Sequence, residues 1–150
     1  MVVRVDFGEA SFLFPGDLEG PAELDMVKNF AGTDILDVDV YQTGHHGSHT
    51  SSFNEFLDAM SPEIVVIPDG VPTRQHSTSA WAYGHPRAEC IDRILPHLTR
   101  DRIPIDGAIA NGVKDFTTVR VEKALYSTGW DGTILIEASD DGTLEVTTGH

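Results

Sequence analysis

The segment between residues 36 and 60 constrains the fold most, because it joins a strand pattern, a histidine-rich loop and a helix pattern. Val38 and Val40 alternate with aspartates before a loop that places three of the seven histidines within five positions. After this loop, Ser52-x-x-Glu55 has the spacing of a capping box at the start of a helix. A strand, a loop and a helix in succession predict an α/β domain.

Strand-like and helix-like hydrophobic patterns surround this segment. Strand patterns occupy residues 3–7, 11–14, 36–41, 64–67, 117–125, 133–138 and 143–148. Helical stripes predict three helices, near residues 19–31, 52–60 and 86–98. Residues 71–83 predict a long exposed loop, and residues 100–114 carry only the turn markers Asp106-Gly107 and Asn111-Gly112. We therefore expect one layered α/β domain over residues 1–150, with a mixed sheet carrying about three helices.

The chain is strongly acidic, with 24 Asp and Glu against 10 Lys and Arg and a formal net charge of −14. This field repels bare nucleic acid and anionic membranes, so a polyanionic substrate needs metal ions or local arginines to hold it. Many aspartates and few lysines are also typical of salt-loving organisms, whose high salt screens the self-repulsion. An ordinary acidic protein is the alternative.

Metal binding, if present, has to use histidine and carboxylate ligands. Cys90 is the only cysteine, so an intramolecular disulfide and a thiolate zinc cluster are both excluded. No apolar run reaches the length of a membrane helix, and the first residues alternate like a strand instead of forming a signal peptide. We expect a soluble chain, cytoplasmic and without direct membrane insertion.

Four candidate site residues lie in three loops at strand ends or helix starts. Asp17 follows the second strand pattern, His45 and His46 follow the third, and His85 precedes a helix pattern. Such edges converge in a layered α/β domain, so the four side chains are expected to face one cleft. Carboxylate and imidazole ligands suit zinc, or manganese where carboxylates dominate. Each residue taken alone has a plainer explanation as an exposed turn or cap residue.

The Gly84-His85-Pro86 motif predicts a helix with Pro86 at its first position. Backbone N–H groups at a helix start attract anions, so His85 is well placed to lie near a phosphate. A solvated cap histidine is the alternative on local grounds.

The order of these motifs resembles the metallo-β-lactamase-fold hydrolases, in particular the ComEC-like branch associated with competence and DNA uptake. The matching segments are Gly16-Asp17-Leu18-Glu19, Gly44 to Ser48, Gly84-His85-Pro86 and Asp131-Gly132-Thr133. The resemblance implies the second half of the layered αββα fold and a metal-dependent hydrolase of phosphodiesters such as nucleic acid.

The resemblance also implies roles for the candidate residues. Asp17 would bridge two zinc ions, and His45 or His46 would be a terminal ligand, with a slight preference for His45. His46 would then be a proton donor or second ligand, and His85 would lie near the scissile phosphate. Two metals would hold a hydroxide and stabilise the leaving oxygen, and a histidine would protonate it.

The first half of the family fold, with its His-x-[His/Asp]-x-Asp-His motif, has no counterpart in this sequence. The chain is therefore interpreted as a partial domain that requires an upstream half or self-association. The alternative function is a non-catalytic half-domain that acts as a binding module. The alternative to a cytoplasmic location is a soluble domain of a membrane-associated protein. A serine hydrolase is disfavoured, because Ser48 lacks a Gly-x-Ser-x-Gly elbow.

Overall fold

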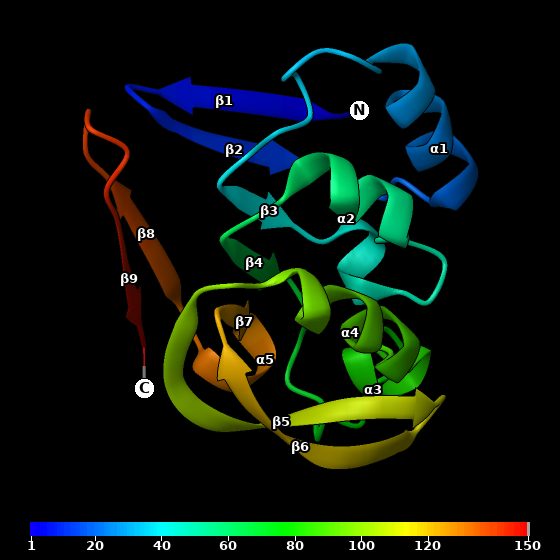
Figure 1. The fold of residues 1–150 in the computed structure, drawn as a ribbon. Coiled ribbons are helices and arrows are strands. Elements are labelled where there is room, and N and C mark those ends of the chain that lie inside the picture. The colour runs from blue at the N-terminus through cyan, green and yellow to red at the C-terminus, as the bar shows by residue number, and fades with distance from the viewer. Residues whose placement is uncertain (150) are drawn as a thin grey trace.

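The computed structural model describes residues 1–149 and contains a mixed five-stranded sheet with the strand order β1-β2-β3-β4-β7 (Figure 1). The hairpin of β1 (Val3–Phe7) and β2 (Ala10–Phe14) is antiparallel. The next strands, β3 (Val40–Gln42), β4 (Ile64–Ile67) and β7 (Leu125–Ser127), follow β2 in parallel. The predicted α/β content, mixed sheet, N-terminal hairpin and interior strand at residues 64–67 are confirmed.

Both faces of this sheet are covered, by different elements (Figure 1). On one face pack α1 (Gly20–Asn29), α2 (Asn54–Met60) and α4 (Ala88–Ile94), and on the other lies the hairpin of β8 (Ile134–Ala138) and β9 (Leu144–Thr148). Neighbouring residues of one strand serve opposite faces, as Tyr41 joins the helix-side core and Val40 the hairpin-side core. Each buried aliphatic side chain contributes roughly 1.5 to 3 kcal/mol to these two cores.

A second hairpin consists of β5 (Asp101–Gly112) and β6 (Asp115–Lys123). No strand is predicted for residues 100–114, and the turn predicted at Asp106-Gly107 is wrong, because both residues lie within β5. Gly107 instead lies inside β5, where a Cβ atom would come within 2.8 Å of the Trp130 ring. The glycine therefore allows close packing of the indole and does not mark a turn.

Several predicted boundaries are also wrong. The helix predicted at residues 86–98 begins at Ala88, and a 3-10 turn, η2 (Leu95–His97), follows it. Pro86 is not the first helical residue, because its carbonyl accepts the N–H of Ala110 in β5. The strand predicted at residues 36–41 is reduced to β3, and that at 117–125 is divided between β6 and β7.

The structure adds two four-residue helices to the three expected ones, α3 (Ala80–Tyr83) and α5 (Thr128–Asp131). The first of them ends the predicted loop at residues 71–83. Beside α5, the guanidinium of Arg102 is 7% exposed and forms a salt bridge of 2.5 Å with Asp131, which is 1% exposed. This pair fixes α5 to β5.

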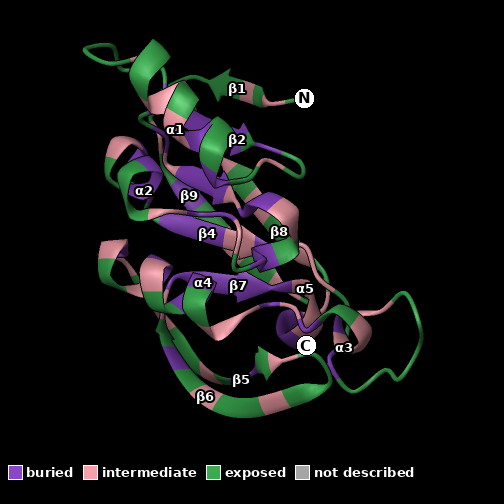
Figure 2. Cartoon of the chain, turned by 90° about the vertical axis from the view of Figure 1, so that its right-hand side faces the viewer, coloured by how far each residue is buried: buried purple, intermediate pink, exposed green. Residues whose placement is uncertain are grey.

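β1, at the N-terminal edge, is the least buried strand of the five-stranded sheet (Figure 2). The side chains of Val3, Val5, Phe7 and Phe14 are 37% to 50% exposed. The sequence interpretation predicts exposed apolar sheet surface, and such surface occurs along β1 and at the end of β2. The αββα layering remains a prediction. No helix in residues 1–149 combines the length and hydropathy needed to cross a membrane.

Candidate functional site

The histidine loop connects β3 to α2 through a single 3-10 turn, η1 (Gly44–Gly47). His45 and His46 both have left-handed backbone angles, with φ of 48° and 55°. Such angles are unfavourable for side chains larger than glycine, so the surrounding contacts must hold the loop in place. The flanking glycines allow this packing, because a Cβ atom on Gly44 would lie 2.7 Å from the carbonyl oxygen of Leu18.

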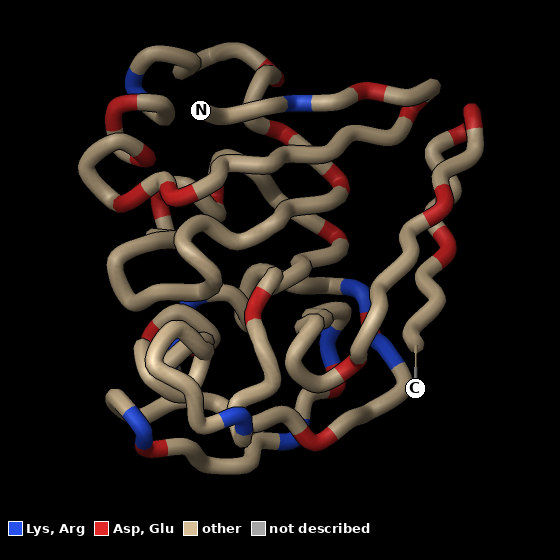
Figure 3. The backbone as a smooth tube through the Cα atoms, turned by 180° about the vertical axis from the view of Figure 1, so that it is seen from behind, with Lys and Arg blue, Asp and Glu red and all other residues tan. Residues whose placement is uncertain are grey.

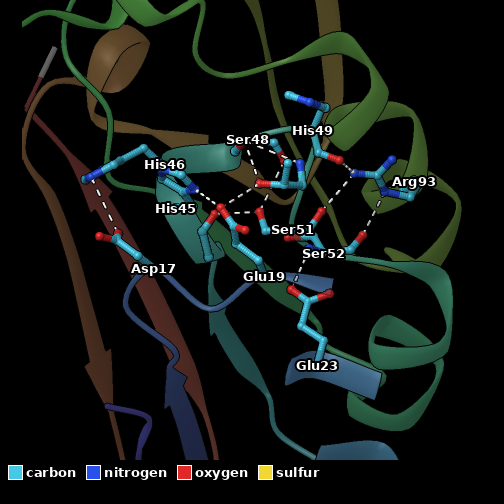
Figure 4. A network of polar contacts seen from close by, with 12 residues as sticks. Asp17, Glu19, Glu23, His45, His46, Ser48, His49, Ser51, Ser52 and Arg93 are labelled. Atoms are coloured by element: carbon cyan, nitrogen blue, oxygen red, sulfur yellow. Dashed lines mark hydrogen bonds and ion pairs between the residues drawn. The ribbon is translucent and has the colours of Figure 1, made fainter. Parts of the chain in front are cut away.

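His46 points towards Asp17 (Figure 4). Its Nδ1 lies 2.6 Å from the carbonyl oxygen of Pro68, which can only accept a hydrogen bond, so Nδ1 carries the proton. The neutral ring then has its lone pair on Nε2, which lies 4.0 Å from Oδ1 of Asp17. Both side chains are more than half exposed. A carboxylate oxygen and an imidazole lone pair therefore face each other at the surface.

His45 points to a different carboxylate. Its Nδ1 lies 2.9 Å from Oε1 of Glu19, and the same oxygen accepts the Thr50 hydroxyl at 3.2 Å. The carboxylate thereby orients the imidazole and favours a proton on Nδ1. The Nε2 of His45 is left to face the surroundings of the site.

His85 is the third imidazole of the cluster. Its ring centroid is 5.8 Å from that of His45, and the Tyr83 ring stacks on it at an interplanar angle of 15°. Burial, together with repulsion from the protonated forms of His45 and His46, lowers the pKa of His85 to about 4. Within residues 1–149 its buried Nδ1 has no hydrogen-bond partner. His85 is therefore neutral at physiological pH.

A buried carboxylate on α1 holds the far end of the histidine loop (Figure 4). Glu23 is 0% exposed, and its two oxygens accept the backbone N–H groups of Ser52 and Phe53 at 2.7 and 3.0 Å. Burial raises the pKa of Glu23. Arg93 donates to the carbonyl oxygens of Ser52 and His49, so an acid and a base clamp the same segment.

The predicted capping box at Ser52 and Glu55 is wrong. α2 begins at Asn54, and its N-cap Phe53 makes no side-chain cap. Ser52 has a left-handed φ of 58°, and its hydroxyl contacts the buried Tyr41 hydroxyl at 2.9 Å. Glu23 takes the place of Glu55 in the box, because it accepts the Ser52 N–H, which the Glu55 carboxylate would otherwise bind.

A cleft of about 530 Å³ adjoins the histidines. Its lining residues include His46, His85, Asp69, Arg74 and Tyr83. Burial raises the pKa of Asp69 to about 6, although hydrogen bonds from Ser127 and Gly129 to its Oδ1 oppose this rise. The volume suits a small-molecule or nucleotide-sized ligand.

The structure therefore brings the four predicted residues close together. Asp17 lies beside His46, and the His45 ring centroid lies 6.5 Å from that of His46 and 5.8 Å from that of His85. Of the four residues, His46 and His85 line the cleft, and Asp17 and His45 do not. Residues 1–149 contain no cluster of three or more His, Cys, Asp or Glu side chains arranged to hold a metal ion. The pair formed by Asp17 and His46 fits two of the three or four ligands of a zinc ion.

Sequence reasoning missed four polar residues of this region, namely Glu19, Glu23, Asp69 and Arg93. A sequence signal exists for Glu19, because it belongs to the Gly16-Asp17-Leu18-Glu19 motif. Glu23 and Arg93 occupy ordinary helix positions, and Asp69 follows a strand as part of a common turn motif. Their burial or contacts depend on tertiary packing, which no local pattern reports.

The chain is similar to proteins of bacterial competence. It is 36% identical over 113 residues to Competence protein ComA of Neisseria gonorrhoeae, an alignment of 75% of this chain and 15% of that protein. It is 28% identical over 100 residues to ComE operon protein 3 of Bacillus subtilis strain 168, covering 67% of this chain and 12% of that protein. Recombination protein 2 of Haemophilus influenzae is 39% identical over 69 residues, 46% of this chain and 8% of that protein.

These names support a competence-related family for the chain. The chain spans at most 15% of the length of these relatives, so the similarity concerns one short region of each. No protein-family model matches the chain, and no solved structure matches it. The metallo-β-lactamase fold predicted from the motifs is neither supported nor contradicted by these comparisons.

Proposed function

We propose that this chain supplies part of a metal-dependent phosphodiesterase site in a competence protein that acts on DNA. The approach of His46 to Asp17 is the single observation that carries the proposal. The similarity to competence proteins supports nucleic acid as the substrate. The resemblance of the motifs to metallo-β-lactamase-fold hydrolases supports hydrolysis as the reaction.

Asp17 and His46 are the proposed metal ligands. The bond from His46 Nδ1 to Pro68 fixes the tautomer whose Nε2 lone pair is free to bind. A bound zinc ion would polarise a phosphoryl oxygen and lower the pKa of bound water. Since His46 makes this approach and His45 does not, we assign the ligand role to His46 and reverse the preference drawn from sequence.

His45 is the proposed proton donor to the leaving oxygen. Glu19 holds its Nδ1 proton, so the proton to be transferred resides on Nε2 of the imidazolium. Neutral His85 lies beside His45 and provides a ring N–H or lone pair near the phosphate without a competing charge. The three imidazoles thus take different roles because each has a different neighbour.

The remaining metal ligands are proposed to come from another segment of the same protein or from a second chain. A zinc site normally has three or four protein ligands, and Asp17 and His46 supply two. The exposed apolar residues of β1 are a suitable place for such a segment to add to the sheet edge. This arrangement corresponds to the partial αββα domain that the motifs predict.

The test is hydrolysis of bis(p-nitrophenyl) phosphate with added Zn²⁺ or Mn²⁺, by the chain alone and mixed with the segment encoded immediately upstream. We expect turnover near background for the chain alone and chelator-sensitive turnover for the mixture, lost in Asp17→Ala. Asp25→Ala, on the exposed surface of α1, is the matched control and should retain turnover. A mixture that binds stably and yet shows no turnover would favour the alternative, a non-catalytic binding module.

A further inference from the structure

Arg74 is an unusual cation in this acidic chain. Among the ten Lys and Arg side chains, all within residues 1–149, it alone has no salt bridge, hydrogen bond or cation–π contact within the described structure. The acidic positions spread along much of the chain in Figure 3 make such an unpaired cation conspicuous. Arg74 lines the cleft beside the histidines.

Tyr83 provides an aromatic surface in the same cleft. It lies at the end of α3, is 56% exposed, and stacks on the His85 ring with centroids 6.3 Å apart. A large exposed aromatic side chain that a neighbouring ring holds in a fixed orientation is a suitable platform for a planar ligand. Tyr83 therefore stacks on His85 and also lines the cleft.

The carboxylate of Asp69 disfavours an anionic ligand group in its part of the cleft. It is the only carboxylate among the residues that line the described cleft, and its Oδ2 is buried without a hydrogen-bond partner. An anionic group would be repelled at this position but attracted at Arg74. A ligand that fits the cleft thus carries a phosphate towards Arg74 and a planar, uncharged ring against Tyr83.

We propose that this cleft is a nucleotide subsite, in which Tyr83 stacks on a base and Arg74 binds the phosphate of the same nucleotide. This inference rests on the proposed function and deepens it, since the occupant is a nucleotide adjacent to the scissile phosphate. The cleft volume of about 530 Å³ lies within the range typical of ligand sites. Because a stacked base must be free of its complementary strand, the substrate is unpaired at this position.

The test is a titration of the ¹⁵N-labelled chain, followed by NMR, with adenosine 5′-monophosphate and with ribose 5-phosphate. These ligands share the phosphate and differ in the base. We expect the nucleotide to bind about fivefold or more tightly, because stacking on one aromatic side chain contributes at least this factor. The perturbed amides should lie in residues 68–85.

Matched variants separate the two contacts. Tyr83→Ala should abolish the preference for the nucleotide, and Tyr83→Phe should retain it because the ring is kept. Arg74→Ala should weaken both ligands several-fold, whereas Arg120→Ala, which removes an exposed arginine of β6, should change neither. Equal affinities for the two ligands, an unchanged preference in Tyr83→Ala, or full binding in Arg74→Ala would each overturn the proposal.

The titration contains EDTA and measures binding without turnover. Absence of hydrolysis in the phosphodiesterase assay would therefore count against the proposed reaction and leave the subsite intact. Conversely, turnover in the absence of a nucleotide preference would overturn the subsite alone.

Discussion

Oδ1 of Asp17 lies 4.0 Å from Nε2 of His46, although the two residues belong to loops that follow different strands. The first loop follows β2 and the second follows β3, and these strands are parallel neighbours in the sheet. The carboxyl ends of parallel neighbours lie at one edge, so strand order alone brings the two loops together. The sheet topology therefore explains why the two loops adjoin.

The clamp at Glu23 predicts a large loss of stability on truncation. Glu23→Ala leaves the N–H groups of Ser52 and Phe53 without their acceptor, which should cost about 2 to 4 kcal/mol. Glu23→Gln keeps one acceptor oxygen and should cost less. Urea unfolding measures both. Glu55→Ala, on the exposed part of α2, is the control and should stay within about 0.5 kcal/mol of the wild type.

If Glu23→Ala unfolded at the same urea concentration as the control, the carboxylate would not be the group that holds the histidine loop. Amide hydrogen exchange gives a second readout. Exchange in residues 44–53 should accelerate in Glu23→Ala and remain unchanged in Glu55→Ala.

The two arginine pairs of the β5–β6 region should differ in their contribution to stability. Arg102→Met leaves Asp131, which is 1% exposed, as an unpaired buried charge, so the loss should be about 3 to 5 kcal/mol. Arg120→Met removes an exposed pair with Asp106 and should cost less than about 1 kcal/mol. Thermal or urea unfolding compares them, and equal losses would show that the buried pair is not structurally important.

Asp69 predicts a pH dependence of stability. Its pKa rises from 3.8 to about 6 on folding, so between these values the unfolded chain loses the proton first and stability falls as pH rises. Asp69→Asn does not titrate, and its free energy of unfolding relative to wild type should therefore increase by about 2.5 kcal/mol between pH 4 and pH 7. Urea unfolding at several pH values measures this difference.

Comparison of the variant with the wild type is necessary because His85 titrates in the same range with the opposite sign. Its lowered pKa makes stability rise with pH between about 4 and 6.5, and this contribution cancels in the difference. A difference between variant and wild type that is constant from pH 4 to pH 7 would contradict the burial of Asp69.

The sequence predicts those elements whose burial produces a clear period. β4 is a continuous apolar run, and β8 and β9 alternate around an Asp-Gly turn, so all three were correctly predicted. β5 was missed because Ile103 is 89% exposed and Gly107 has the appearance of a turn residue. Its extended conformation depends on pairing with β6 and on the Trp130 ring, neither of which is a local property.

The sequence identifies the residues of the candidate site. It does not predict the contacts between their side chains. Asp17, His45, His46 and His85 stand in recognisable loops, and the parallel strands explain why the Asp17 loop meets the loop of His45 and His46. The loop of His85 follows α3 and is joined to the histidine loop by the hydrogen bond from the Arg87 N–H to the Gly47 carbonyl oxygen. Which imidazole faces which carboxylate depends on the left-handed backbone of η1. That conformation depends on contacts with Leu18 and on the clamp at Glu23, which come from packing.

The most direct test of the account is a zinc titration of the chain labelled with ¹⁵N at histidine. We predict weak binding that shifts Nε2 of His46 first, with Nδ1 of His46 remaining protonated by its bond to Pro68. Asp17→Asn should weaken the binding about tenfold or more, whereas Asp25→Asn, on the exposed surface of α1, should not. Zinc that leaves His46 Nε2 unperturbed, or that binds equally well to Asp17→Asn, would contradict the assignment of these two residues as metal ligands.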